Sequence, residues 1–201
     1  MAPSRFARGM KAGPSMLERS RIVLALARGA IEDALDGRAR RRPPDAAWLA
    51  EHGSSFVTLR QDGDLRGCIG SLEAHRPLAD DIVANAVAAA LHDRRFPPVA
   101  AFELASLKVE VSILTPSEPL ACADEHDALV KLRPGIDGVV LEYGRQRATF
   151  LPQVWESLPD AAIFIRELKR KAGLPADFWH ADLRVRRYSV EKHSEAKDSV
   201  Q

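Results

Sequence analysis

The stretch DLRGCIGSL, from Asp64 to Leu72, places Cys68 between two glycines in a segment that otherwise has the composition of a β-strand. The β-rich run FVTL at 56–59 precedes it, and the intervening QDGD is typical of a turn, so the two segments predict a β-hairpin. Glycine weakens a strand. Gly67 and Gly70 therefore indicate either a bend in the chain or a close approach of its backbone to something else.

Helical patterns lie on both sides of this hairpin. Apolar residues recur at spacings of three and four from Ser15 to Gly37, where Ser15 can cap the start of a helix. A second helical face begins at Pro77 and ends near Asp93. After it, LKVEVSILT at 107–115 alternates with a period of two, which predicts a half-buried strand.

The same order of elements recurs in the second half of the chain. A hairpin is expected over 138–152, a helix over 161–171 and a strand over 183–190. Hairpin, helix and strand thus appear twice, which indicates a duplicated unit. Because hairpins take the place of alternating strands and helices, the expected class is α+β, with a mainly antiparallel sheet and helices packed on it.

The boundaries of the folded part follow from these elements. Residues 15–193 are expected to form one domain, with two subdomains possible at about 15–120 and 121–193. The basic N-terminal segment 1–14 has neither an apolar core region nor an amphipathic period, so we expect a disordered tail there. A second tail is expected at 194–201.

Composition excludes several classes of protein. With 29 Lys and Arg against 28 Asp and Glu, the net charge of +1 provides no overall field for nucleic acid or anionic lipid. No apolar run approaches the roughly 18 residues of a membrane span. The two cysteines are too few for a disulfide framework, so we expect a cytoplasmic protein. The sequence contains no C-x-x-C or H-E-x-x-H motif for a metal site. It contains no G-x-G-x-x-G motif or P-loop for a nucleotide, and it does not identify a cofactor.

Several blocks, in order along residues 16–191, resemble the AMMECR domain family. They are LRGCIGSL at 65–72, PL at 77–78, RFPP at 95–98, EVSILTPSEPL at 110–120, PGIDGVVL at 134–141, RATFLPQVWE at 147–156 and KAGLP at 171–175. The resemblance implies an α+β fold with a duplicated architecture. Many relatives carry a histidine where this chain has Asp137, which argues against a universal catalytic role at that position.

The resemblance also implies partners. Bacterial members of the family are called protein A of the AmmeMemoRadiSam system, and they accompany a Memo-type protein and a radical S-adenosylmethionine enzyme. This chain has no three-cysteine run that would bind the cluster of such an enzyme. The resemblance therefore implies a component of a multi-protein system, and it leaves the reaction unassigned.

The strand LRGCIG is the best candidate for a site. Alternation places Arg66 and Cys68 on the same face, and an arginine near a thiol favours the thiolate, so Cys68 is a candidate nucleophile. Gly67 and Gly70 would leave the strand open to a bound small molecule or peptide. The other interpretation is structural: Cys68 is a small buried hydrophobe, and the glycines mark a bulge.

A cysteine nucleophile needs a base, and two histidines are candidates. His75 follows the strand, and His92 falls in the last turn of the next helix, where the helix dipole alone also favours a histidine. Arg95 in DRRFPP could hold a carboxylate or phosphate, and Glu110 in the alternating strand could supply a carboxylate to a cleft.

Three functions follow from these candidates. The first is an enzyme or substrate-handling component that binds a small molecule or peptide around Arg66 to Gly70. The second is a non-catalytic adaptor or scaffold that docks the Memo-type or radical S-adenosylmethionine partner. The third and weaker one is nucleic-acid binding through RARRRPP at 38–44, which lacks interleaved aromatic residues.

Overall fold

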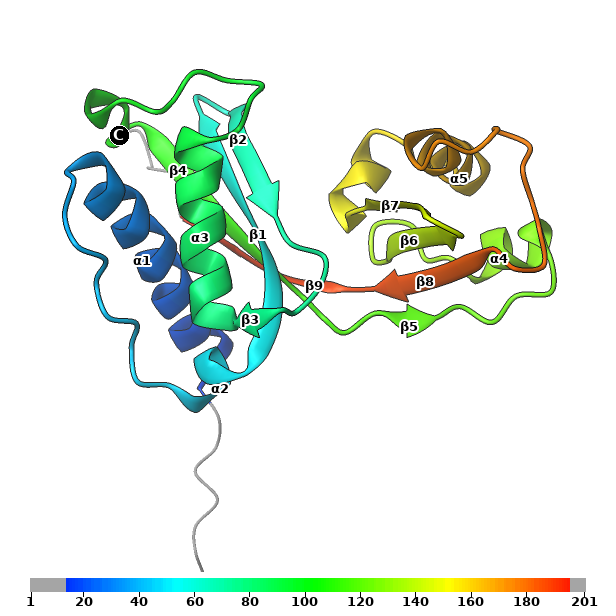
Figure 1. Cartoon of the computed structure of the whole chain (residues 1–201), viewed down its shortest axis with the longest axis horizontal. Coiled ribbons are helices and arrows are strands. Elements are labelled where there is room, and N and C mark those ends of the chain that lie inside the picture. Colours follow the sequence, from blue (N-terminus) through cyan, green and yellow to red (C-terminus); the bar gives the residue numbers. More distant parts are fainter. Residues whose placement is uncertain (1–13, 196–201) are drawn as a thin grey trace, which may run out of the picture.

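The computed structural model describes residues 14–195, which fold into two lobes (Figure 1). The N-terminal tail predicted at 1–14 lies outside these residues, apart from Pro14. Ser194 and Glu195, which the sequence places in the C-terminal tail, instead belong to the folded chain. Ser194 ends strand β9 (Val190–Ser194), and the carboxylate of Glu195 accepts hydrogen bonds from Arg28 at 2.6 and 2.5 Å. The remainder of that tail lies outside the described residues.

The larger lobe is an antiparallel sheet with helices over one face (Figure 1). Its strands lie in the order β2-β1-β4-β9, with the short β3 beside β1. Their bounds are β1 (His52–Gln61), β2 (Asp64–Gly70), β3 (Arg76–Pro77) and β4 (Leu107–Leu114), with β9 as given above. The helices are α1 (Met16–Leu35), α2 (Ala47–Ala50) and α3 (Leu78–Leu91), followed by the 3-10 helix η1 (Ala101–Glu103).

The predicted helices of this lobe are confirmed, because their caps and apolar faces are in place. Ser15 and Glu18 form a reciprocal capping box at the start of α1. α3 begins at Leu78, directly after Pro77. Their buried faces pack with the inner face of the sheet, and this core includes Val23, Ala27, Ile31, Val57, Leu59, Ile82, Ala86 and Val111. Among residues 14–195, no helix is both long and apolar enough to cross a bilayer.

The smaller lobe is a four-stranded antiparallel sheet in the order β5-β8-β6-β7. Its strands are β5 (Glu118–Pro119), β6 (Gly138–Tyr143), β7 (Gln146–Phe150) and β8 (Arg184–Tyr188). Its helices are α4 (Glu125–Lys131), α5 (Ala161–Lys171) and the 3-10 helix η2 (Pro152–Glu156). Trp155 stacks on Phe164 with ring centroids 3.8 Å apart and anchors the separate core of this lobe.

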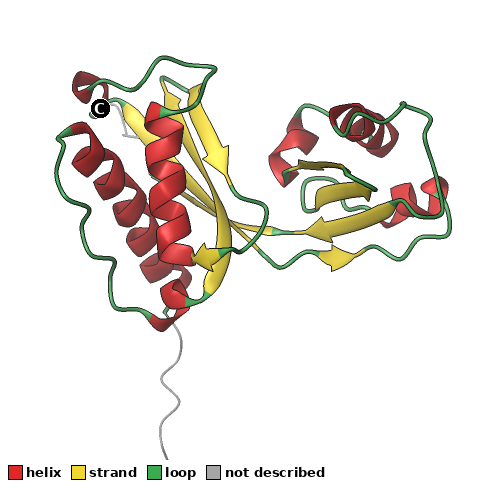
Figure 2. Cartoon of the chain, viewed as in Figure 1, coloured by secondary structure: helices red, strands yellow, loops and turns green. Residues whose placement is uncertain are grey.

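The hairpin, helix and strand occur twice, as β1-β2, α3, β4 and as β6-β7, α5, β8. In each unit the last strand pairs with the first strand of the hairpin. The antiparallel α+β class is therefore confirmed, but the strands divide between two sheets, and Figure 2 shows one sheet in each lobe. The division arises because each unit has its own buried core.

Each unit also gives a strand to the other. β5 follows β4 along the chain but pairs with β8, whereas β9 follows β8 and pairs with β4. The strand predicted over 183–190 is consequently two strands, which separate at Ser189 where the chain passes between the lobes. There the Thr115 amide donates to the Ser189 carbonyl at 2.9 Å, so two antiparallel segments connect the lobes.

Candidate functional site

The two glycines of the LRGCIG strand allow close packing. A Cβ added at Gly67 would lie 2.2 Å from the backbone oxygen of Ala89 in α3, and one added at Gly70 would lie 2.2 Å from the ring of Phe56. The pairing of β1 with β2 also shifts register beside Arg66, as a β-bulge does. Both structural expectations for these glycines, a bulge and a close approach, therefore apply within one strand.

Arg66 is bound by the loop that follows α3. Its guanidinium makes two hydrogen bonds to the Glu103 carboxylate, at 2.9 and 3.0 Å, and one to the Pro97 carbonyl at 2.9 Å. Both side chains of the ion pair are 12% exposed, and the guanidinium lowers the pKa of Glu103. Arg66 thus fastens the loop to β2, and its donors are directed to that loop.

Arg95 and Asp93 bind the free backbone groups of Cys68 at the edge of β2. The Cys68 amide donates to Asp93 at 2.9 Å, and the Cys68 carbonyl accepts from Arg95 at 3.1 Å. Asp93 is buried and paired with Arg95 at 2.6 Å, which holds the pKa of this carboxyl well below its usual range. Two side chains thereby satisfy backbone groups that an edge strand leaves unpaired.

The thiol of Cys68 is half-buried, with its Sγ 3.3 Å from Thr58 Oγ1. His92 follows the last residue of α3 and is exposed, while His75 lies 3.2 Å from Glu73 and is 71% exposed. Within residues 14–195, neither histidine contacts Cys68. The structure therefore brings Cys68, Arg66 and Arg95 into one region without a histidine base.

Glu110 lies in the same row of the larger sheet as Cys68, because Thr58 of β1 is paired with Cys68 on one side and with Glu110 on the other. Its carboxylate is 3.4 Å from Arg60 and 3.1 Å from Lys192, and its side chain is 17% exposed. Two flanking cations already balance its charge. In the described part of the chain, no group of three or more His, Cys, Asp or Glu side chains is placed to hold a metal ion.

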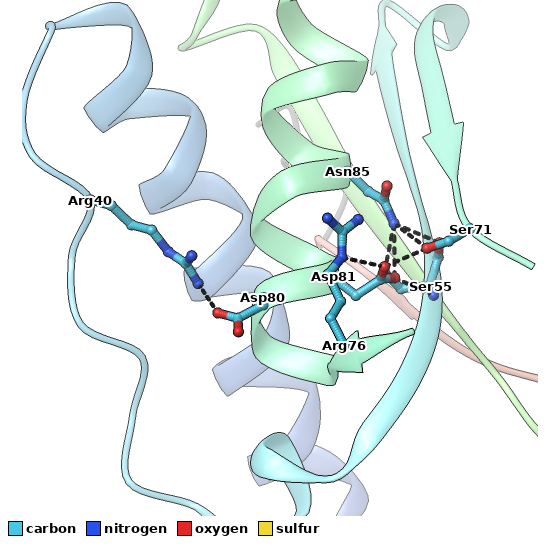
Figure 3. Close-up of polar contacts among 7 residues, drawn as sticks. All are labelled: Arg40, Ser55, Ser71, Arg76, Asp80, Asp81 and Asn85. Carbon is cyan, nitrogen blue, oxygen red and sulfur yellow. Dashed lines mark hydrogen bonds and ion pairs between the residues drawn. The ribbon is translucent and has the colours of Figure 1, made fainter. Parts of the chain in front are cut away.

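A buried carboxylate organises the segment that follows β2 (Figure 3). Asp81, in the first turn of α3, is 1% exposed and accepts from the Ser55 amide and hydroxyl, both at 2.8 Å, and from Asn85 at 2.9 Å. Its other oxygen accepts from Ser71 and, at 2.9 Å, from Arg76. A fully bonded buried network of this kind fixes the positions of its members, here the two ends of segment 71–76.

Segment 72–74 forms one wall of a cleft between the lobes, which we call the junction cleft and which has a volume of about 330 Å³. Its lining comes from both lobes and from the connecting segment: His52, Gly53, Ser54, Leu72, Glu73, Ala74, Leu114, Thr115, Pro116, Ser117, Val140, Arg147, Arg186 and Tyr188. Clefts between domains commonly bind small molecules.

Two arginines from the smaller sheet supply the positive charge of the junction cleft. Arg147 forms an ion pair across the lobes with Glu73 and lowers the pKa of that carboxyl. Arg186 donates to the hydroxyl of Ser117 at 2.9 Å and to its carbonyl at 2.5 Å. Within residues 14–195, no carboxylate lies within ion-pair distance of Arg186, so its charge is available to an anion in the cleft.

The floor of the junction cleft is apolar and rigid. Tyr188 packs with Leu114 and Val140, and its ring covers Gly138, where an added Cβ would lie 2.4 Å from the ring. The Tyr188 hydroxyl is 3.0 Å from Thr149 Oγ1, and burial raises the pKa of the phenol to about 12. Tyr188 therefore remains neutral near pH 7 and shapes the cleft.

Sequence reasoning missed Asp81, Arg147 and Arg186. Arg147 opens the block RATFLPQVWE, and alternation along 184–188 places Arg186 on the face opposite Arg187. These signals identify candidate residues. No sequence signal shows that they meet Glu73 and Ser117, which are far from them along the chain.

Comparisons with known proteins agree with this fold. The AMMECR1 family matches residues 24–193. A protein of Methanothermobacter thermautotrophicus is 40% identical over 190 residues, which cover 90% of this chain and 97% of the relative. Protein MJ0810 of Methanocaldococcus jannaschii is 36% identical, over 90% of this chain and 92% of that protein. The crystal structure of the uncharacterized protein PH0010 from Pyrococcus horikoshii aligns with a TM-score of 0.79 at 36% identity, covering 86% of this chain and 89% of that one.

Proposed function

Because the chain belongs to the AMMECR1 family, we propose that it is a substrate-handling component of a multi-protein system and binds a small oxyanion in the junction cleft. The oxyanion is a carboxylate or a phosphate. The partners are those that the resemblance implies, a Memo-type protein and a radical S-adenosylmethionine enzyme, and the setting is the cytoplasm.

One observation carries this proposal: the guanidinium of Arg186 lines the junction cleft and is bound only by Ser117 among the described residues. A guanidinium matches carboxylate and phosphate oxygens in geometry and charge. Arg147 lines the same cleft, but its charge is balanced by Glu73 and Glu142, so Arg186 is the cation that an oxyanion would meet. The volume of about 330 Å³ suits a small molecule.

The surroundings of Cys68 include a cation, Arg95, but no hydrogen bond from a histidine base among the described residues. A nucleophilic cysteine is activated by an adjacent base or a nearby cation. Here the thiol lies beside Thr58, and the donors of Arg66 are directed to Glu103 and Pro97. Cys68 therefore lacks a hydrogen-bonded base, and its contact with Thr58 gives it a place in the packing of the strand.

Calorimetric titration with succinate and with inorganic phosphate, at ionic strength matched with chloride, tests the proposal. We expect saturable binding of one of the two by the full chain, and the ligand that binds identifies the oxyanion. Arg186→Gln should weaken that binding about tenfold, as the loss of a charge-assisted hydrogen bond does. The matched control is Arg187→Gln, because Arg187 is the next residue and pairs with Glu118 instead.

Two outcomes would contradict the proposal. One is an absence of binding by both probes at millimolar concentration. The other is an equal loss of affinity in Arg186→Gln and Arg187→Gln, which would indicate a general effect of charge. Cys68→Ser should retain the affinity of the unmodified chain, and a loss of binding in that variant would move the site to β2.

A second candidate function, the non-catalytic adaptor, is favoured by Phe102. This side chain is 86% exposed on η1, next to Glu103, which the ion pair with Arg66 holds in place. A large exposed aromatic residue on a fixed element is typical of protein interfaces. If Phe102→Ala abolishes capture of the purified partners while Arg186→Gln retains it, the adaptor function is supported and the junction cleft is not needed for docking.

A further inference from the structure

A second cavity lies on the larger lobe and shares no lining residue with the junction cleft. It has a volume of about 380 Å³ and runs between α1 and the segment 38–46, and we call it the outer groove. Its floor is apolar and consists of residues from α1, from α3 and from segment 38–46: Ile22, Ala25, Leu26, Gly29, Ala30, Pro44 and Val83. Space next to apolar side chains is the usual setting for an apolar ligand.

Ion pairs hold segment 38–46 in place over this floor. Arg41 binds Asp33 and Glu32 near the end of α1, both at 2.9 Å, and its guanidinium passes over Gly29. Arg40 reaches across to Asp80 on α3 at 2.5 Å (Figure 3). These ion pairs fix the segment beside α1 and α3, and Arg41 packs directly on α1 at Gly29.

Two further cations line the outer groove and form no ion pair among the described residues, although Arg21 also lies near Glu18 of α1, whose pKa is lowered by the Ser15 hydrogen bonds and by Arg21. Arg21 on α1 and Arg42 on the segment are exposed, and both are among the lining residues. No carboxylate in the described part of the chain lies within ion-pair distance of either guanidinium. The groove thus combines an apolar floor with two cations that an acidic head group could neutralise.

We propose that the outer groove binds a single-chain carboxylic acid, with its alkyl chain along α1 and its carboxylate at Arg42 or Arg21. The apolar floor suits an alkyl chain, and the exposed guanidinium groups of Arg21 and Arg42 suit a carboxylate.

Titration of the full chain with octanoate, decanoate and dodecanoate, each below its micelle concentration, tests the chain-length dependence. Every methylene that enters the groove should strengthen binding by up to about fourfold. Decanol and decylamine, which lack the acid, should bind at least tenfold more weakly than decanoate. Equal binding of decanol and decanoate would overturn the assignment of the head group. A lack of saturable decanoate binding would overturn the proposal.

Variants locate the bound acid. Ala25 is an exposed position of α1 that lines the groove, so Ala25→Trp should fill the space and abolish decanoate binding while the circular dichroism spectrum is retained. Decanoate binding unchanged by Ala25→Trp would place the ligand elsewhere and overturn the proposal. If that variant does not fold, the arginine variants provide the test.

Arg42→Gln or Arg21→Gln should weaken decanoate binding by about three- to tenfold, and the larger loss identifies the residue that holds the carboxylate. Arg94→Gln, an exposed arginine outside the groove, is the control and should stay within twofold. Losses no greater than in this control would contradict the proposal. Arg186→Gln should leave decanoate binding unchanged, which separates this proposal from that of the junction cleft.

Discussion

At the level of single residues, the contacts of each side chain, and the space left by each glycine, explain the sequence of the LRGCIG strand. Arg66 holds the loop after α3 through Glu103, and Asp93 and Arg95 of that loop bind the backbone of Cys68. Gly67 leaves room for the backbone of α3. The charges in this region are paired, and Arg66, Glu103 and Asp93 are largely removed from water, whereas the side chain of Arg95 is exposed. A paired buried charge becomes costly when its partner is lost, because the remaining charge stays buried.

Arg66→Gln should therefore destabilise the protein by about 2–3 kcal/mol, since it leaves the buried Glu103 carboxylate without its cation. Urea unfolding at pH 7 measures the effect. Arg94→Gln, an exposed change in the neighbouring loop, should stay within about 0.5 kcal/mol of the unmodified chain. Equal stabilities of the two variants would show that the ion pair contributes nothing to the fold.

His193 provides a second prediction at this scale, on the dependence of stability on pH. The side chain is 2% exposed on β9, and burial lowers its pKa from the ordinary value of 6.5, although Glu191 lies 3.1 Å from Nε2 and favours the proton. Arg19 of α1 opposes protonation. Below pH 6.5 the unfolded chain then binds more protons than the folded chain, so stability falls as the pH decreases.

Urea unfolding at pH 7.5, 6.5 and 5.5 should show a loss of at most about 1.4 kcal/mol per pH unit below 6.5. His193→Leu removes the titrating group and should flatten this dependence, whereas His75→Gln, at an exposed position, should retain it. Asp93 does not contribute in this range, because its lowered pKa keeps it ionised. An identical pH dependence in His193→Leu would assign the effect to other groups.

At the level of elements, α3 and β2 pack without an intervening side chain. The carbonyl of Ala89 occupies the space that a side chain at position 67 would need. This contact joins the hairpin to the helix that follows it, and it is the reason for a glycine inside a strand. The other glycine, Gly70, makes room for the ring of Phe56 at the lobe junction.

Gly67→Ala should destabilise the protein by about 2–3 kcal/mol, because the added methyl group would meet rigid backbone and force α3 away from the sheet. Thermal unfolding measures the stability of this variant against that of the unmodified chain. Leu65→Ala in the same strand removes a side chain that is 38% exposed and should cost less than half as much. A neutral Gly67→Ala would show that α3 can shift at little cost.

The elements were predictable from the sequence to the extent that local patterns determine them. Ser15 and the 3-4 spacing locate α1, and the turn after β1 locates the first hairpin. The break at Ser189 was not predictable, because alternation continues through it while the chain passes from one sheet to the other. Nor was the partner of Arg66, since Glu103 lies 37 residues away.

At the level of the whole molecule, the exchange of β5 and β9 makes each sheet depend on the other unit. The larger sheet ends in a strand that follows the smaller lobe along the chain, and the reverse holds for the smaller sheet. The junction cleft lies where these segments cross, with a lining that extends from His52 to Tyr188. Only the assembled fold brings these residues together, so the sequence indicated the LRGCIG region but not the cleft.

The exchanged strands predict that the two lobes unfold together. Leu168 of α5 is fully buried in the smaller lobe, and Leu168→Ala should cost about 2–4 kcal/mol. Hydrogen exchange measured by mass spectrometry then shows whether the two lobes open together. If both lobes open in one cooperative step, the slowest amides of β1, in the larger lobe, should exchange at least about 30-fold faster in the variant.

The reciprocal experiment is Leu59→Ala, which makes a cavity in the core of the larger lobe, with exchange followed in β6 of the smaller one. The same acceleration is expected there, because β9 cannot leave β4 without disturbing the strand β8 that precedes it. Acceleration confined to the mutated lobe in both variants would show that the lobes open independently. The segments that cross at Thr115 and Ser189 would then connect two separately stable units.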